Sequence, residues 1–140
     1  MDISDNFRSQ EFQQPARHGF QVEAYPEAWI DERLIPLCEA LEAIRAAFRK
    51  PIRVLSGFRS AAYNAKIGGA KRSQHVQGRA ADITIRGIPA QDLHDKILQL
   101  HKEKRIKISG LGLYIEANFV HVDVRPTKRL ARWSGTRTVV

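Results

Sequence analysis

Apolar residues recur at helical spacing along one stretch in the first third of the chain. Between Asp31 and Lys50 they fall every three or four positions, which places them on one face of a helix: Leu34, Leu37, Leu41, Ile44 and Phe48. Asp31 is suited to cap the start of this helix and Pro51 to mark its end. Pro36 lies near the start, where a proline costs least. The pattern therefore predicts an amphipathic helix that packs one face on a core.

Two further stretches have helical character. Pro89 begins a segment that reaches about Lys104, and its apolar face holds Leu93, Ile97 and Leu100. Residues 60–66 indicate a short helical turn that Gly68-Gly69 closes, and residues 71–79 indicate a loop.

The pattern changes to short, strand-like segments elsewhere. The three residues Glu116-Ala117-Asn118 separate two of these segments, which indicates a hairpin. Strands with flanking helices favour an α+β fold, with helices packed on one side of a mainly antiparallel sheet. The predicted strands cover residues 52–56, 80–85, 111–115 and 119–124.

The two ends of the chain lack a clear periodicity. We interpret residues 1–30 as an irregular segment that wraps the core and packs aromatic rings on it, with a short helix starting near Ser9. Residues 126–140 form a basic tail, which Trp133 is placed to anchor. A length of 140 residues suits one domain, so we expect a single domain over residues 1–140.

The net charge of the chain limits its possible binding partners only partly. The formal net charge is +8, which attracts polyanions such as nucleic acid or an anionic cell wall. No helix-turn-helix, zinc-finger or RNA-binding signature is present, so no specific nucleic-acid partner is expected. The single cysteine, Cys38, excludes an intramolecular disulfide and falls in an apolar helical pattern. Nothing in the sequence specifies an oligomer, and we expect a monomer.

The first residues and the hydropathy bear on localisation. Met1 is followed by acidic and polar residues rather than by the basic and apolar regions of a secretory signal. No apolar run approaches the roughly 18 residues that suggest a membrane span. We therefore expect a product made in the cytoplasm without a signal peptide, which reaches a cell wall only if it is released, as in phage or prophage lysis.

The most informative chemistry lies between residues 73 and 82. His75 is expected in a loop and Asp82 in an apolar strand seven positions later, with Gly78 allowing the chain to turn between them. A buried carboxylate is costly unless it is paired or bound to a cation. Taken singly, His75 has the ordinary interpretation of a loop histidine, and Asp82 could pair with Arg79 or Arg86.

The predicted strand over residues 119–124 carries a second polar pair. His121 and Asp123 share one face because alternate side chains of a strand point the same way, whereas the valines point to the other face. We expect Arg125 not to neutralise Asp123. Two histidines, one carboxylate and an open position match a catalytic zinc site.

Several motifs together resemble a known family. They are Ser56-Gly57-Phe58-Arg59-Ser60, Tyr63-Asn64, Gly68-Gly69-Ala70, Ser73-x-His75-x-x-Gly78-x-Ala80-x-Asp82 and Phe119-Val120-His121-Val122-Asp123. In this order they are similar to the M15 peptidases, which include zinc D-Ala-D-Ala carboxypeptidases and phage endolysins. The resemblance implies an α+β fold with one zinc ion per chain, held by His75, Asp82 and His121. It also implies that Arg59 lies in the active site, where it holds substrate or stabilises the oxyanion.

The sequence departs from many of these relatives at the general base. They carry a glutamate or aspartate three residues before the last zinc histidine, where this chain has Asn118. We expect Asp123 to be the base because it shares a face with His121, with Glu116 as the second choice. An alternative makes Asp123 the ligand and His121 the acid/base.

The resemblance implies a zinc metallopeptidase that hydrolyses stem peptides or crosslinks of bacterial peptidoglycan. Either a D-Ala-D-Ala carboxypeptidase or an endolysin-type endopeptidase fits, and the sequence does not distinguish them. The alternative is a zinc-stabilised module that binds a cell wall or a protein with weak or no catalysis. Asn118 keeps that alternative open.

Overall fold

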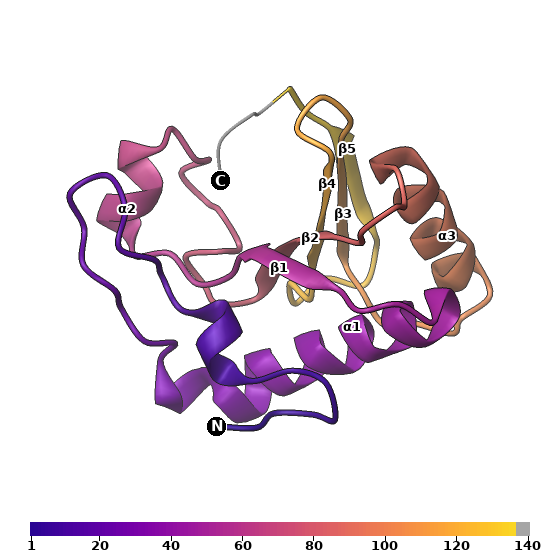
Figure 1. Ribbon diagram of the computed structural model, residues 1–140, viewed down its shortest axis with the longest axis horizontal. Helices are drawn as coiled ribbons and strands as arrows, with labels where there is room; N and C mark the ends of the chain where they lie inside the picture. The colour runs from indigo at the N-terminus through magenta and orange to yellow at the C-terminus, as the bar shows by residue number, and fades with distance from the viewer. Residues whose placement is uncertain (137–140) are drawn as a thin grey trace.

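The computed structural model describes residues 1–136, which form a five-stranded sheet with three α-helices (Figure 1). The strands are β1 (Arg53–Ser56), β2 (Ala80–Thr84), β3 (Gly110–Tyr114), β4 (Phe119–Asp123) and β5 (Ala131–Ser134). The helices are α1 (Ile35–Phe48), α2 (Ala61–Lys66) and α3 (Ala90–Lys102).

The strands run in the order β1-β2-β4-β3-β5 across the sheet. Every neighbouring pair is antiparallel except β3 and β5, which are parallel. The predicted α+β fold with a mainly antiparallel sheet is therefore confirmed. The expected hairpin is formed by β3 and β4, and the first two predicted strands pair with one another as β1 and β2.

The strand register places one residue from each strand in a single row across the sheet. Ser56 pairs with Asp82, Asp82 with His121, His121 with Gly112, and Gly112 with Trp133. Directly paired residues of neighbouring strands point to the same face. Residues that lie 77 positions apart in sequence, from 56 to 133, thus meet in one line on one face of the sheet.

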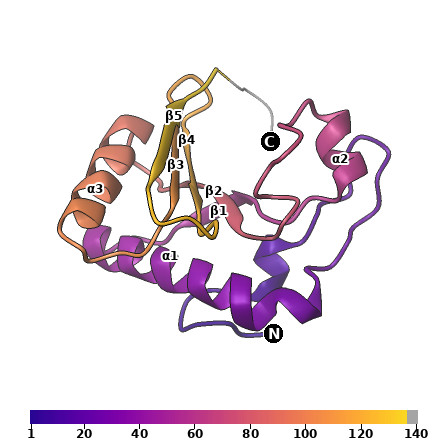
Figure 2. The same ribbon diagram turned by 180° about the vertical axis from the view of Figure 1, so that it is seen from behind.

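The opposite face of the sheet is apolar and is covered by the two long helices. In Figures 1 and 2, α1 runs below the sheet and α3 stands beside β3 and β4. The short α2 lies on the side of these strands away from α3 (Figure 2). The sheet contributes to the core Ala81, Ile83, Leu111, Leu113, Val120 and Val122, and α1 contributes Leu37, Cys38, Leu41 and Ile44.

The start of the first long helix differs from the prediction. Residues Ile30–Leu34 form a π-helical turn, α1 begins at Ile35, and no side chain caps it, so Asp31 is not a cap. The helix ends at Phe48 because Arg49 takes a left-handed conformation, with φ of 54°. Its amphipathic face nevertheless packs on the core as the spacing predicts.

The two ends of the chain are more ordered than the periodicity indicates. The N-terminal segment includes a 3₁₀ helix over Ser9–Phe12 and buries Phe7, Phe12 and Tyr25 in the core. The tail contains β5, a strand that the sequence analysis did not expect. Arg137, a cation of this tail, lies outside the described residues.

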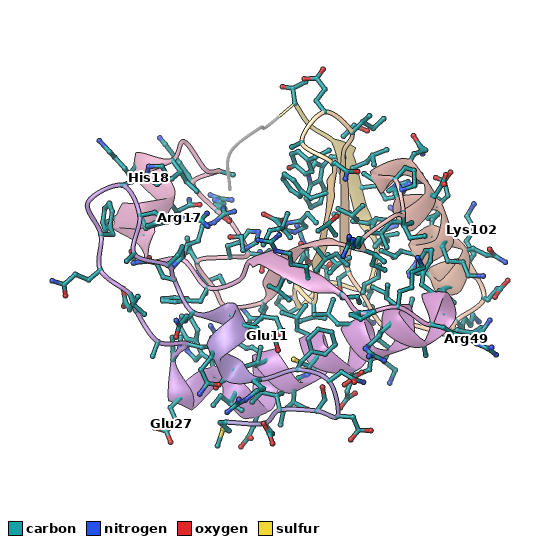
Figure 3. All side chains as sticks on the ribbon, in the orientation of Figure 1. Glu11, Arg17, His18, Glu27, Arg49 and Lys102 are labelled. Atoms are coloured by element: carbon teal, nitrogen blue, oxygen red, sulfur yellow. The ribbon has the colours of Figure 1, made fainter. Side chains whose placement is uncertain are left out.

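The basic residues lie on more than one side of the molecule. Arg17 lies near α2, whereas Arg49 and Lys102 lie at the opposite end of the molecule (Figure 3). Within residues 1–136, none of the helices combines the length and the apolar character that crossing a bilayer would require.

Candidate metal centre

A cleft of about 270 Å³ opens on the polar face of the sheet. Its floor carries the row of residues described above, and one wall is the loop between α2 and β2. The residues that line it are Arg59, Ala70, Arg72, Ser73, Gln74, His75, Asp82, Tyr114, Phe119, His121, Arg125 and Trp133. The sequence-predicted residues His75, Asp82, His121 and Arg59 therefore converge on one cavity, whereas Asp123 lies beneath it.

His75 projects from the loop with a defined tautomer. Its Nδ1–H donates to the carbonyl oxygen of Gly57 at 2.7 Å, and a carbonyl can only accept. The lone pair of the neutral ring is then on Nε2, which lies 3.1 Å from Asp82 Oδ1. Burial lowers the pKa of His75 to about 4, so the ring is neutral near pH 7.

The loop reaches this position through a turn at Gly78. Its φ of 68° lies in the left-handed region, and a Cβ there would overlap Trp29 and the hydroxyl of Tyr25. That hydroxyl donates to the Gly78 carbonyl at 2.7 Å. The turn predicted at Gly78 is therefore present, and the N-terminal segment supports it.

Asp82 lies in the middle of β2 and is buried. Its Oδ1 faces both histidines at 3.1 Å, and its Oδ2 accepts from Arg59 Nη2 at 3.1 Å. Burial alone would raise the pKa of Asp82, but the interactions with His75 and His121 outweigh burial and hold that pKa well below its ordinary value. The carboxylate is thus charged, with one oxygen anchored and the other directed at the histidines.

His121 extends from β4, and Asp123 of the same strand fixes the orientation of its ring. Its Nε2–H donates to Asp123 Oδ2 at 2.7 Å, and its Nδ1 lies 3.1 Å from Asp82 Oδ1. Burial would lower the pKa of His121, but the hydrogen bonds to Asp123 and Asp82 raise it overall. The alternative considered from the sequence makes Asp123 the metal ligand and His121 the acid/base. In the structure, the side chain of β4 that faces Asp82 Oδ1 is His121, and Asp123 binds the other nitrogen of its ring.

The three donor atoms fit a cation. His75 Nε2 and His121 Nδ1 both face the same carboxylate oxygen, an arrangement that a positive charge makes favourable, supplied either by a metal ion or, without metal, by a proton on His121. One donor atom from each of His75, Asp82 and His121 lies within 4.8 Å of the others. Two imidazole nitrogens and one carboxylate oxygen on a cleft floor match the three-ligand set of a catalytic zinc, which leaves a fourth position for water or substrate.

Asp123 is more fully paired than the sequence analysis expected. Its Oδ1 accepts from the backbone N–H and Nε–H of Arg125 at 3.1 and 2.9 Å, and its Oδ2 accepts from Arg125 Nη2 and His121 Nε2, both at 2.7 Å. The expectation that Arg125 does not neutralise Asp123 is wrong, because residues two apart on an extended chain share a face. A carboxylate offers about four acceptor positions, and all four are occupied here.

Arg59 is buried rather than free. It is 1% exposed, and its guanidinium donates to Ser56 Oγ at 3.0 Å and Asn64 Oδ1 at 3.2 Å in addition to Asp82. Its backbone N–H donates to the His75 carbonyl at 3.1 Å. Arg59 therefore ties β1, α2 and the loop to the metal-ligand candidate Asp82, while it also borders the cleft.

The two residues near the expected base position do not line the cleft. Asn118 occupies the β3–β4 turn with φ of 54°, and its Oδ1 accepts from the backbone N–H of Ala90 at the start of α3. Glu116 is exposed in the same turn. Among residues 1–136, the carboxylate that borders the cavity is that of Asp82.

Sequence reasoning gave no role in the site to several residues that shape it. Ser56 and Asn64 bind Arg59, and Trp133 reaches the cleft from β5. On β3, a Cβ at Gly110 would overlap the carboxylate of Asp123 and a Cβ at Gly112 would overlap Trp133, so both positions require glycine. The available signal was the alternation Gly110-x-Gly112, which begins one residue before the strand predicted over residues 111–115, beside the His121-x-Asp123 alternation.

A buried His-Asp-His cluster at a cleft floor defines a candidate metalloprotein, and its family follows from comparison with known proteins. The profile described as Peptidase M15 matches residues 6–123, which is most of the chain. The chain therefore belongs to the peptidase M15 family, as the motif resemblance implies.

Two curated relatives share parts of this sequence. The chain is similar to the Peptidoglycan L,D-endopeptidase MepK of Escherichia coli (strain K12), with 34% identity over 85 residues that cover 57% of this chain and 43% of that protein. It is 50% identical over 44 residues to the Zinc D-Ala-D-Ala carboxypeptidase of Streptomyces albus G, which covers 31% of this chain and 17% of that protein. The chain thus matches less than half the length of each of these relatives.

Proposed function

We propose that this chain is a zinc-dependent peptidase that hydrolyses peptide bonds in the stem peptides or crosslinks of bacterial peptidoglycan. The proposal carries over the activities that the names of the two relatives state, although this chain matches only part of the length of each relative. Acting on a wall polymer requires access to the wall, so the chain would work after release from the cytoplasm or in an equivalent exposed location. All the donors come from one chain, and a monomer is sufficient.

The observation that carries the proposal is the convergence of His75 Nε2, Asp82 Oδ1 and His121 Nδ1 at the floor of the cleft. We propose that these three atoms hold the zinc ion. Bound there, zinc would supply Lewis-acid polarisation of the scissile carbonyl and would lower the pKa of water.

Arg59 has two roles in this proposal. It holds the second oxygen of Asp82, which leaves the first oxygen directed at the histidines. Arg59 also borders the cleft, where its positive charge would stabilise the charge that develops on oxygen or would bind a substrate carboxylate. Because the side chain is buried and ordered by Ser56 and Asn64, this charge needs no reorganisation during the reaction.

For Asp123, the contacts favour a supporting role over that of general base. Its four acceptor positions are used by Arg125 and His121, which leaves none for an attacking water. We propose that Asp123 fixes the tautomer of His121 so that Nδ1 is the ligand atom, as carboxylates do for zinc-bound histidines generally. Glu116 remains the second candidate for a proton acceptor, and it would need the β3–β4 turn to approach the cleft.

The test is digestion of purified peptidoglycan of defined composition with the zinc-loaded chain, followed by mass spectrometry of the released fragments. Hydrolysis by the unaltered chain and none by His75→Ala supports the proposal, and the fragment masses identify the bond. The matched control is His101→Ala, which removes a histidine of α3 outside the cleft and should leave hydrolysis unchanged. Absence of new fragments at full zinc occupancy rules the peptidase out.

A second function is favoured by one observation. The cleft wall carries no carboxylate besides Asp82 among the described residues, and Asn118 is turned toward α3. A zinc-stabilised module that binds wall peptides with little turnover would need no base. Co-sedimentation with peptidoglycan that depends on zinc, without fragment release, would distinguish this module from the peptidase.

A further inference from the structure

Trp133 comes from β5, which lies beyond the residues matched by the family profile, yet it lines the cleft. Its ring centroid lies 4.9 Å from that of His121, with the two planes at 54°. One residue of the row, Gly112 of β3, lies between His121 and Trp133. The indole reaches the histidine because Gly112 has no side chain to fill the gap.

The position of the indole is fixed by further contacts. Its Nε1–H donates to the hydroxyl of Tyr114 at 2.9 Å, and Tyr114 in turn stacks on Phe119 with centroids 4.5 Å apart. A Cβ at Gly135 would overlap the ring of Tyr114, so a second glycine is needed for this arrangement.

The same indole also contacts the residue that pairs with Asp123. The guanidinium carbon of Arg125 lies 5.3 Å from the Trp133 ring centroid, within the range of a cation–π interaction. Trp133 therefore contacts His121 directly. It also contacts Arg125, which binds Asp123. Three constraints act on the imidazole of His121: the hydrogen bond that its Nε2–H donates to Asp123, the carboxylate of Asp82 and the indole of Trp133.

We propose that Trp133 is a positioning residue for the metal ligand His121 and also forms the apolar wall of the substrate site. Asp123 fixes one nitrogen of His121, but a single hydrogen bond leaves the ring free to tilt about that contact. The indole blocks the tilt because it occupies the space into which the imidazole would move. On the cleft side, Trp133, Tyr114 and Phe119 form an aromatic surface that suits an aliphatic side chain next to the scissile bond.

The first arm of the test measures metal binding and does not depend on the proposed peptidase activity. Zinc affinity is measured by competition with a chromophoric chelator, and ligand geometry by the visible spectrum of the cobalt-substituted protein. Trp133→Ala should lower zinc affinity about 10-fold or more, as loss of outer contacts to a ligand typically does, and should shift the cobalt spectrum. Trp133→Phe keeps a ring against His121 and should retain most of the affinity.

Two controls separate positioning from general damage. Phe48→Ala removes an aromatic side chain at the end of α1, outside the cleft lining, and should leave zinc affinity near that of the unaltered chain. Tyr114→Phe deletes the hydroxyl that holds the indole and should give a smaller loss than Trp133→Ala. If Trp133→Ala does not fold, Trp133→Phe and Trp133→Leu are compared, and the phenylalanine variant should bind zinc more tightly.

The second arm rests on the proposed function and uses a soluble stem-peptide substrate at saturating zinc. Trp133→Leu should raise KM for substrates with an aliphatic residue beside the scissile bond more than for a glycine analogue. Equal zinc affinity and an unchanged cobalt spectrum in Trp133→Ala would overturn the positioning role. Equal KM values for the two substrates in both proteins would overturn the apolar wall. A chain that binds zinc normally but cleaves nothing disproves the peptidase and leaves the first arm intact.

Discussion

The two faces of the sheet show two different ways of holding a fold together. The face toward α1 and α3 is apolar, and its stability is shared among many aliphatic side chains that each contribute through burial. The opposite face concentrates charged and aromatic groups in one row, and each group there is held by specific partners. A substitution on the first face is thus expected to change stability broadly, whereas a substitution on the second should change one chemical property with little effect on the rest.

Adjacent residues on β4 give the largest contrast. His121→Ala removes a proposed ligand, and we expect zinc binding and peptidoglycan hydrolysis to be lost. Val122→Ala, on the other face, should keep zinc and activity but lower the free energy of unfolding by about 2 kcal/mol, through lost burial and a residual cavity. Elemental analysis and urea denaturation measure the two effects. Zinc retained in His121→Ala would show that the polar row is not the metal site.

Asp123→Asn tests how the polar row is supported. Asparagine keeps the size but not the charge that Arg125 and His121 share, so zinc affinity should fall about 10–100-fold. If Asp123 only positions His121, saturating zinc should restore most of the activity. A loss of about 10²–10⁴-fold that persists at full zinc occupancy would instead identify Asp123 as the general base. Asp92→Asn, an exposed carboxylate on α3, is the control.

Arg59→Lys should have a smaller effect on metal binding. Lysine retains the charge but cannot reach Ser56, Asn64 and Asp82 at once, since it lacks the planar fork of donors. We expect zinc affinity to fall about 10-fold, which is the lower end of the range for outer contacts, together with a reduced kcat. If Arg59 only bound substrate and did not hold Asp82, the substitution would leave zinc affinity unchanged. Arg86→Lys, at an exposed position outside the cleft, provides the comparison.

The smallest effect concerns the stability of the metal-free protein against pH. The raised pKa of His121 means that its protonated form stabilises the fold below about pH 6.5, and that this contribution is lost as pH rises through the raised value. The pKa of His75, lowered to about 4, acts in the opposite direction, since stability is lost as pH falls from about 6.5 toward 4. Each proton changes the unfolding free energy by at most about 1.4 kcal/mol per pH unit.

Urea denaturation of the metal-free chain between pH 5 and 9 measures this balance. His121→Gln should remove the decline on the alkaline side while leaving the acid side in place. If the variant and the unaltered chain decline in parallel above pH 6.5, the proton on His121 does not contribute to the stability of the metal-free protein.

Much of the fold could be read from the sequence because most elements carry a local pattern. The hairpin of β3 and β4, the apolar face of α1 and the loop that bears His75 all follow from spacing and from turn residues. The strand β5 was missed because it has only four residues and alternates partly buried with exposed positions, among them Arg132 and Trp133. Its pairing with β3 is parallel and depends on Gly112, which no local pattern in the tail reveals.

In the candidate site, too, some residues could be predicted from local sequence and others could not. The residues His75, Asp82 and His121 could be singled out because histidines and a carboxylate in apolar or constrained segments need a chemical reason. The burial of Arg59 and the saturation of Asp123 could not, because each depends on partners from other elements: Ser56, Asn64 and Arg125. The side of the strand on which Arg125 lies could have been predicted from the period of two alone.

The pair Gly110 and Gly112 has a consequence for how such sites diversify over evolutionary time. Because each glycine vacates the space that a specific side chain on a neighbouring strand fills, Gly110 is constrained together with Asp123, and Gly112 together with Trp133. A lineage that acquires alanine at Gly110 must first give up the carboxylate at Asp123, and one that loses Trp133 releases the constraint on Gly112. Sequence searches that score each glycine together with its partner, Asp123 or Trp133, should therefore separate chains that retain this arrangement from those that have abandoned it.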